Sequence, residues 1–168
     1  DEDFFQEYRQ MRRSKEGLSG AGEWPALKAM LPDLCGKCVL DLGCGFGWHC
    51  KYAADHGAAR VVGIDLSGKM LRVAREKNAA AGIEYRQIAI EAYDYPRNAF
   101  DVVLSSLAFH YLADWSGLCK KIAGTLKSGG DFIFSVEHPI FTAQGPQDWC
   151  YKADGSIAHW PVDRYFEE

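Results

Sequence analysis

The chain has 168 residues, 48% of them hydrophobic, and a formal net charge of −4. This length and composition favour a single compact domain with one well-filled core. An acidic chain offers no diffuse positive field to a phosphate backbone, which disfavours nucleic acid as a partner. It has no apolar run of about eighteen residues that could span a bilayer, and Asp1-Glu2-Asp3 lacks the basic segment of a signal peptide. We therefore expect a soluble, cytoplasmic protein that acts on a small molecule; its oligomeric state is left open.

The first part of the chain has the pattern of short helices. Aromatic residues at helical spacing predict an amphipathic helix over Phe4 to Arg13, followed by a Gly/Ser loop at residues 17–22. Pro25 suits the first turn of a second helix that ends near Leu31. Tyr8, Arg9 and Trp24 are candidates for a lid over a ligand, or equally for ordinary helix core.

Apolar runs that end in glycine or aspartate alternate with helical patterns over the next hundred residues. Ser67 and Asp114 are suitable N-caps for two of the helices, and Ser128-Gly-Gly130 is expected to break the chain before the last strand. Such alternation predicts a doubly wound, mostly parallel sheet in a three-layer α/β/α sandwich. The predicted strands are 38–42, 60–65, 83–88, 100–104 and 132–136, and the predicted helices are 48–56, 69–81 and 114–127.

Glycines crowd the turn after the first predicted strand, in Asp41-Leu-Gly-Cys-Gly-Phe-Gly47. Glycine permits a tight turn and a close approach of ligand to backbone, and the following helix presents unpaired N–H groups. A dinucleotide fingerprint would need its third glycine where Trp48 stands, so a nicotinamide-dependent oxidoreductase is disfavoured. Asp65 ends the second strand, where a carboxylate can accept hydrogen bonds from both hydroxyls of a ribose.

This D-x-G-x-G-x-G turn with the acid at Asp65 resembles the class I S-adenosylmethionine (SAM) dependent methyltransferases, of the small-molecule kind (types 11 and 25). The resemblance covers Val39 to about Val136. It implies a Rossmann-like core at 38–138, preceded by a helical cap at 1–37 and followed by a lid or hairpin extension at 139–168, all in one domain. The family's fold continues with an antiparallel strand pair, which we expect this chain to lack. In the extension, Ala153-Asp-Gly155 between two aromatic runs predicts a β-hairpin.

The resemblance also implies a set of residues that bind SAM. Asp65 would bind the ribose, and Asp41 would order the glycine loop and the ammonium end of the methionine, unless it only caps a loop. Leu66 and Met70 would sandwich the adenine, although both suit ordinary core, and Ala89 departs from the family's usual Asp. The predicted cofactor-binding residues are Asp41, Gly43, Gly45, Gly47, Asp65, Leu66, Met70, Ile90 and Ser105.

Methyl transfer requires alignment of nucleophile and methyl group, and a base where the nucleophile carries a proton. His110 follows the fourth strand, and Glu137 and His138 follow the fifth, so these three are the predicted catalytic residues; each could instead have a structural role. No metal is expected, because the Cys35-Gly-Lys-Cys38 pair has no second pair at zinc spacing and the other cysteines lie in apolar segments.

The sequence thus favours SAM-dependent methylation of an O, N or C atom of a small-molecule acceptor. Two alternatives stay open: methylation of tRNA or protein, and a SAM-binding module without catalytic activity that regulates a partner.

Overall fold

The computed structural model describes residues 2–141 and 148–162, with the side chains of residues 2–4 and 7 left out. The chain divides into two compact units, Asp1–Ser135 and Val136–Glu168. Each unit is described by itself. The parts of the predicted extension at 142–147 and 163–168 lie outside the described residues.

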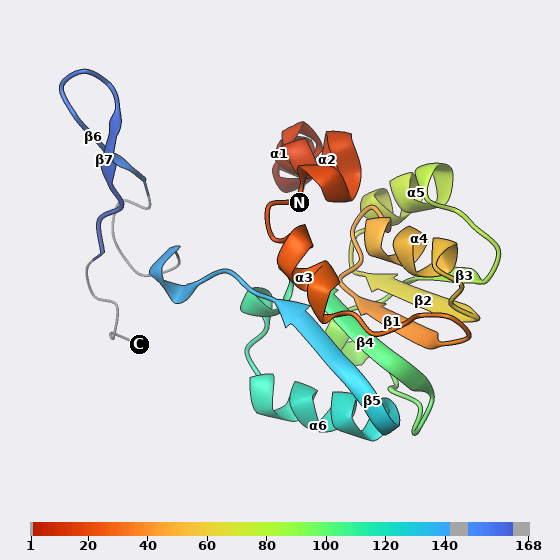
Figure 1. The fold of residues 1–168 in the computed structure, drawn as a ribbon. Coiled ribbons are helices and arrows are strands. Elements are labelled where there is room, and N and C mark those ends of the chain that lie inside the picture. Colours follow the sequence, from red (N-terminus) through yellow and green to blue (C-terminus); the bar gives the residue numbers. More distant parts are fainter. Residues whose placement is uncertain (1, 142–147, 163–168) are drawn as a thin grey trace. The chain divides into compact units, whose positions relative to one another are not determined.

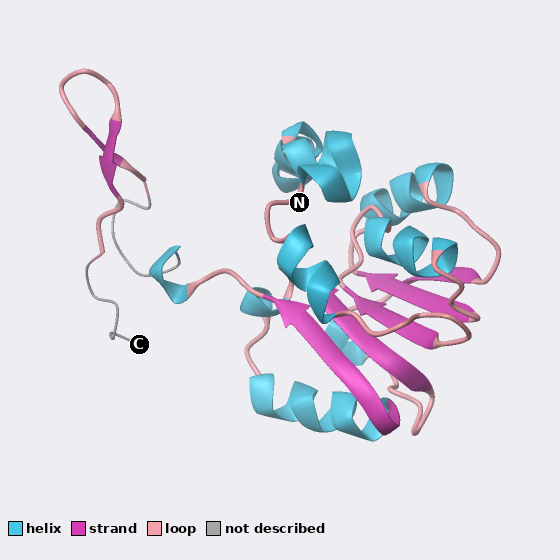
Figure 2. Ribbon diagram, viewed as in Figure 1, coloured by secondary structure: helices cyan, strands magenta, loops and turns pink. Residues whose placement is uncertain are grey.

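The first unit is built on a five-stranded sheet with the strand order β3-β2-β1-β4-β5 (Figures 1 and 2). Neighbouring strands pair in parallel throughout. The chain runs outward from β1 to β3 and then returns to the other side of β1, so the switch point lies between β1 and β4. The predicted parallel α/β architecture is confirmed. The strands are β1 Cys38–Leu42, β2 Arg60–Asp65, β3 Ile83–Gln87, β4 Phe100–Ser106 and β5 Leu126–Ser135.

Helices cover both faces of this sheet and complete three layers (Figure 1). The helices α3 (Trp24–Met30), α4 (Trp48–Asp55) and α5 (Gly68–Lys77) lie on one face, and α6 (Trp115–Thr125) lies on the other. Alternate residues of β1 supply the two cores: Val39 packs with Leu27, Ala53 and Leu71, whereas Leu40 and Leu42 pack with Leu118 and Ile122. This division follows from the period of two along a strand.

Both predicted helix caps are confirmed. The Oγ of Ser67 accepts a hydrogen bond from the Met70 N–H at 3.3 Å, and Oδ1 of Asp114 accepts one from the Gly117 N–H at 2.8 Å. Each side chain thereby satisfies an N–H group that lacks a partner within its helix.

Several predicted boundaries were wrong. The helix predicted over 69–81 ends at Lys77, because Asn78 leaves the helical conformation with φ −125° and ψ 27°. The N-terminal helix is divided into α1 (Glu2–Gln10) and α2 (Arg12–Glu16), because Met11 between them is extended, with φ −60° and ψ 147°. Neither Gly nor Pro marks this break, so the residue pattern did not reveal it. Ser128-Gly-Gly130 does not break the chain before a strand: β5 already begins at Leu126 and its register shifts at these glycines, where Gly129 has φ 77°. The glycines therefore form an irregularity within the strand.

The second unit contains the short antiparallel hairpin of β6 (Cys150–Tyr151) and β7 (Ile157–His159). Gly155 takes φ 80° in the turn, and its N–H donates to the Lys152 carbonyl at 2.9 Å. The hairpin predicted around Ala153-Asp-Gly155 is confirmed. Across the described parts of both units, no helix is long and apolar enough to cross a membrane.

Candidate active site

A cavity of about 790 Å³ lies at the carboxyl ends of β1, β2, β3 and β4 in the first unit. This volume is in the range of small-molecule sites. The glycine loop after β1 forms its floor, together with the segments that follow β2, β3 and β4. Residues between Tyr8 and Ala21 line it from the N-terminal helical segment, including η1 (Gly17–Gly20). The cavity thus lies at the switch point, where ligands bind in open parallel sheets.

The glycine loop is held against its surroundings by close backbone contacts. The N–H groups of Gly43 and Cys44 both donate to the Ile64 carbonyl at 2.9 Å. Gly43 has φ 73°, and a Cβ added there would lie 2.6 Å from the Cβ of Ala108. Gly45 lines the cavity at φ 53°. A side chain at Gly43 would therefore collide with the segment after β4.

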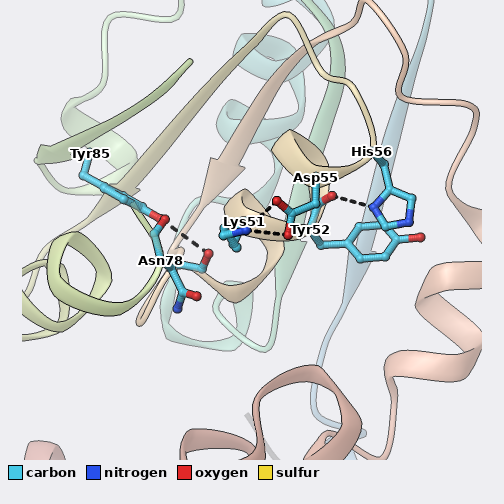
Figure 3. A network of polar contacts seen from close by, with 7 residues as sticks. Lys51, Tyr52, Asp55, His56, Asn78 and Tyr85 are labelled. Atoms are coloured by element: carbon cyan, nitrogen blue, oxygen red, sulfur yellow. Dashed lines mark hydrogen bonds and ion pairs between the residues drawn. The ribbon is translucent and has the colours of Figure 1, made fainter. Parts of the chain in front are cut away.

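Gly47 is not among the residues that line the cavity and lies against Tyr85 of β3. The hydroxyl of Tyr85 donates to the Asn78 carbonyl at 2.9 Å (Figure 3), and a Cβ added at Gly47 would lie 2.2 Å from that hydroxyl. Asn78 in turn donates from Nδ2 to the Phe46 carbonyl at 2.7 Å. Gly47 is thus required for packing behind the loop and does not line the cavity.

Asp65 is held rigidly at the end of β2. Its Oδ2 accepts from the Gly45 N–H and its Oδ1 from the Ser67 N–H, both at 2.8 Å. Burial raises the pKa of this carboxyl, against the two backbone hydrogen bonds that lower it. Asp65 lines the cavity, and each oxygen keeps acceptor capacity beyond the backbone bond. The arrangement can present two acceptors to a pair of neighbouring hydroxyl groups.

Apolar side chains line the cavity beside Asp65. Met70 and Ile90 are 3% and 8% exposed, whereas Leu66 is 72% exposed and stands at the cavity wall. An exposed leucine at the edge of a cavity is suited to covering a flat apolar ring. Ala89 and Glu91 line the same end.

Besides Gly47, two more of the predicted cofactor residues lie behind the cavity wall. Asp41 is fully buried, accepts from the Cys50 thiol at 3.2 Å, and its Oδ1 has no partner among the described residues. Burial raises the pKa of Asp41 to about 7, helped by the nearby Asp65 charge and opposed by the Cys50 hydrogen bond. Ser105 is also buried, and its hydroxyl donates to the Leu42 carbonyl at 2.7 Å. The neighbouring Ser106 lines the cavity instead.

A polar cluster lies where β4 ends, and sequence reasoning missed the contributions of Arg13, Glu23 and His49 to it. The Ser106 hydroxyl donates to Oε1 of Glu23 at 3.1 Å, and Arg13 forms an ion pair with the same carboxylate. Arg13, Ser106 and His49 line the cavity. The sequence offered one signal for this cluster, because His49 stands two positions after the last glycine of the loop. The direction of its side chain, however, depends on packing that the sequence does not reveal.

Of the three predicted catalytic residues, only His110 belongs to the same unit as the cavity. His110 lies in η3 (Phe109–Tyr111), beside the lining residue Tyr111, and its Nδ1 is buried without a partner among the described residues. Glu137 and His138 belong to the second unit, so the roles of all three stay predictions. The described residues contain no cluster of three or more His, Cys, Asp or Glu that could hold a metal ion.

The fold and the cavity together define an α/β domain with a candidate ligand site at the switch point of a parallel sheet. A family model described as a methyltransferase domain matches residues 40–134. The chain belongs to this methyltransferase family.

Solved structures with the same fold include two relatives of high identity. A proposed SAM-dependent methyltransferase of Listeria monocytogenes is 59% identical with a TM-score of 0.80, covering 87% of this chain and 68% of that one. A SAM-dependent methyltransferase of Mesorhizobium loti is 46% identical with a TM-score of 0.80, covering 90% and 68%.

Curated relatives extend beyond this chain. A Haemophilus influenzae protein of uncharacterised function is 40% identical over 91% of this chain, which spans 63% of that protein. A ubiquinone biosynthesis O-methyltransferase of Idiomarina loihiensis is 40% identical over 61% of this chain, which spans 43% of that enzyme.

Proposed function

We propose that this protein binds SAM in the cavity of the first unit and transfers its methyl group to an O, N or C atom of a small-molecule acceptor. The observation that carries the proposal is the Asp65 carboxylate, fixed by the Gly45 and Ser67 N–H groups beside a glycine loop at the switch point. Family membership and the two SAM-dependent methyltransferases among the solved relatives support it.

The residues present fit the parts of SAM. Asp65 is suited to the ribose hydroxyls, and Leu66, Met70 and Ile90 provide apolar surface for the adenine. Gly45 has no side chain and lines the cavity at φ 53°, so the methionine part can lie close to its backbone. Asp41, Gly47 and Ser105 would act indirectly, by holding this loop and the end of β4 in place.

When bound, SAM supplies a methyl group on a positively charged sulfur, which makes the group reactive without a metal. The protein's part is to orient the two reactants and to keep water away. The N-terminal segment contributes Tyr8, Leu18 and Ala21 to the cavity wall, and a Cβ at Gly17 would lie 3.1 Å from the Trp48 ring. This close packing suits a cover over the reacting groups.

A small acceptor agrees with the net charge of −4, which gives no general attraction for RNA. The related enzymes named for their substrates include the ubiquinone O-methyltransferases and a phosphoethanolamine N-methyltransferase of Arabidopsis thaliana, 34% identical over 60% of this chain. These names span O and N acceptors and therefore leave the methylated atom open.

Isothermal titration with SAM and, separately, NAD tests the binding half of the proposal. We expect SAM to bind and NAD not to bind, with Asp65→Ala weakening SAM at least about 30-fold, because two charge-assisted hydrogen bonds are lost. Asp55→Ala is the matched control, since Asp55 pairs with Lys51 on the exposed face of α4 (Figure 3). Absence of SAM binding by the folded protein would overturn the proposal.

Turnover separates the proposal from its alternatives. Release of S-adenosylhomocysteine is measured with phenols, amines, tRNA and basic peptides as acceptors. Methylation of a phenol or amine supports the proposal, whereas methylation of tRNA or peptide alone identifies a macromolecular methyltransferase. SAM binding without turnover of any acceptor would favour a regulatory SAM-binding module.

A further inference from the structure

The cavity has a second end, formed at the carboxyl end of β4. Asp65 follows β2 and Ser106 ends β4, and these strands flank β1 on opposite sides. Strands in a sheet are about 4.8 Å apart, so the two residues are separated by roughly 10 Å along the sheet edge. We call the part of the cavity lined by Arg13, His49 and Ser106 the β4 end. It is distinct from the ribose position at Asp65.

The β4 end is held together by a hydrogen-bonded network that joins distant segments. Glu23, just before α3, accepts from Ser106 on β4 and pairs with Arg13 on α2. The Ser135 hydroxyl extends the network from β5, donating to that of Ser106 at 3.1 Å. The side chains of Arg13 and Glu23 are 19% and 26% exposed. Because the two charges neutralise each other, the network can contact a polar ligand without adding net charge.

His49 lies in the first turn of α4 and faces this network. Its ring is 5.4 Å from that of Trp24, and its Nε2 is shielded from solvent with no hydrogen-bond partner among the described residues. An unsatisfied buried ring nitrogen costs stability, so a structure that retains one usually provides for a partner from outside the protein. His49 lines the cavity, so a turn of its ring toward the cavity would let a bound molecule supply that partner.

The surroundings of His49 keep its ring neutral. Burial lowers its pKa to about 4, with a further lowering by the Arg13 charge that exceeds the opposing influence of Glu23. These are the charged groups that face it, one from α2 and one from the segment before α3. At neutral pH the ring therefore has one nitrogen free to accept a hydrogen bond.

Building on the proposed function, we propose that the β4 end binds the acceptor and that Nε2 of His49 takes the proton from its nucleophilic hydroxyl or amine. Ser106 and the Arg13–Glu23 pair would hold the remainder of a small, polar acceptor. In the balanced reaction the bond from the acceptor's O or N to the methyl carbon forms, the sulfur–carbon bond breaks with its electron pair remaining on sulfur, and the proton moves to His49. The protonated ring would then lose its proton to solvent.

Charge balance supports this assignment. A positive sulfur near the ring disfavours its protonation before transfer, and that charge is removed as the methyl group leaves. Protonation of His49 therefore becomes more favourable at the moment when the acceptor must lose its proton. Of the two charges that face the ring, Glu23 favours the product cation and Arg13 opposes it more strongly, so the loss of the sulfur's charge is the change that favours protonation.

The position of His49 is tested by nuclear Overhauser effects in the complex with SAM carrying a ¹³C-labelled methyl group. We expect contacts from this methyl group to the ring protons of His49, identified by their loss in His49→Gln. Methyl contacts to other residues without any to His49 would overturn the proposal. Failure of SAM to bind at all would instead count against the proposed function, so the two failures are distinguishable.

The role of His49 is tested with the first phenol or amine that the protein methylates. His49→Gln should lower kcat about 100-fold or more, the usual size of a lost general base, with less than about a threefold change in the Kd for S-adenosylhomocysteine. The matched control is His56→Gln at the end of the same helix, where Nδ1 of His56 donates to the Tyr52 carbonyl at 2.8 Å (Figure 3). An unchanged kcat in His49→Gln, or an equal loss in His56→Gln, would overturn the role.

Discussion

At the scale of single residues, the protein places two carboxyl groups near one loop and gives them different surroundings. Asp65 borders the cavity and accepts two backbone hydrogen bonds, whereas Asp41 is enclosed and accepts one hydrogen bond from the Cys50 thiol. The pKa of Asp41 is near 7 because its charged form has little solvation. Burying the charged form of Asp41 behind the glycine loop therefore lowers the stability of the folded protein.

This burial predicts a pH-dependent effect of Asp41→Asn. A carboxyl whose pKa is raised on folding destabilises the folded state progressively as the pH rises from the unfolded value near 4 to the folded value near 7. Asn has no charge to bury, so the stability of the variant relative to the natural protein should increase with pH, by about 3 kcal/mol between pH 5 and pH 8. Urea unfolding without ligand at pH 5 and pH 8 measures it; an equal difference at both pH values would contradict it.

A second residue-scale prediction concerns the back of the glycine loop. Gly47→Ala should lower the free energy of unfolding by about 1–3 kcal/mol, because its Cβ would overlap the Tyr85 hydroxyl at a φ of 77°. Gly124→Ala in α6 is the control: its Cβ meets open space, and alanine should stabilise the helix by about 0.5–1 kcal/mol. Urea unfolding gives both values. Equal effects of the two substitutions would show that the contact with Tyr85 is unimportant.

At the scale of elements, the two capped helices allow the effect of a helix cap on stability to be separated from its effect on SAM binding. Ser67→Ala and Asp114→Ala should each cost about 1 kcal/mol in the free energy of unfolding, because each leaves a helix N–H without its partner. Ser67 lines the cavity, whereas Asp114 caps α6 on the opposite face of the sheet. Titration with SAM should therefore show weaker binding for Ser67→Ala alone. Equal affinities in the two variants would mean that the start of α5 does not contribute to the ligand site.

At the scale of the whole molecule, the two units differ greatly in how their backbones are protected. Leu40, Val62 and Val103 in the central strands are fully buried, whereas all three residues of β7 are exposed. A hairpin of this size is marginal by itself. Hydrogen exchange should be slowest in β1, β2 and β4 and faster by orders of magnitude in β6 and β7. SAM should slow exchange in the glycine loop; protection of the hairpin without ligand as strong as that of the central strands would contradict this order.

The sequence determined the features that depend on local patterns. Apolar runs of strand length ending in glycine or aspartate specified β1 and β2, and Ser67 and Asp114 marked the starts of α5 and α6. The glycine spacing and Asp65 pointed to the edge of the sheet where the cavity lies. These signals succeed because strand burial, capping and tight turns each depend on a few neighbouring residues.

Tertiary structure decided which side chains meet. Glu23 and Ser106 are 83 positions apart, and they meet because α3 packs near the ends of β4 and β5. The same packing shields Nε2 of His49, while Asp41 and Ser105 alternate away from the cavity along their strands. A local pattern can place a residue near the correct edge of the sheet. Whether its side chain lines the cavity or lies behind the wall depends on the packing of segments far away in the chain.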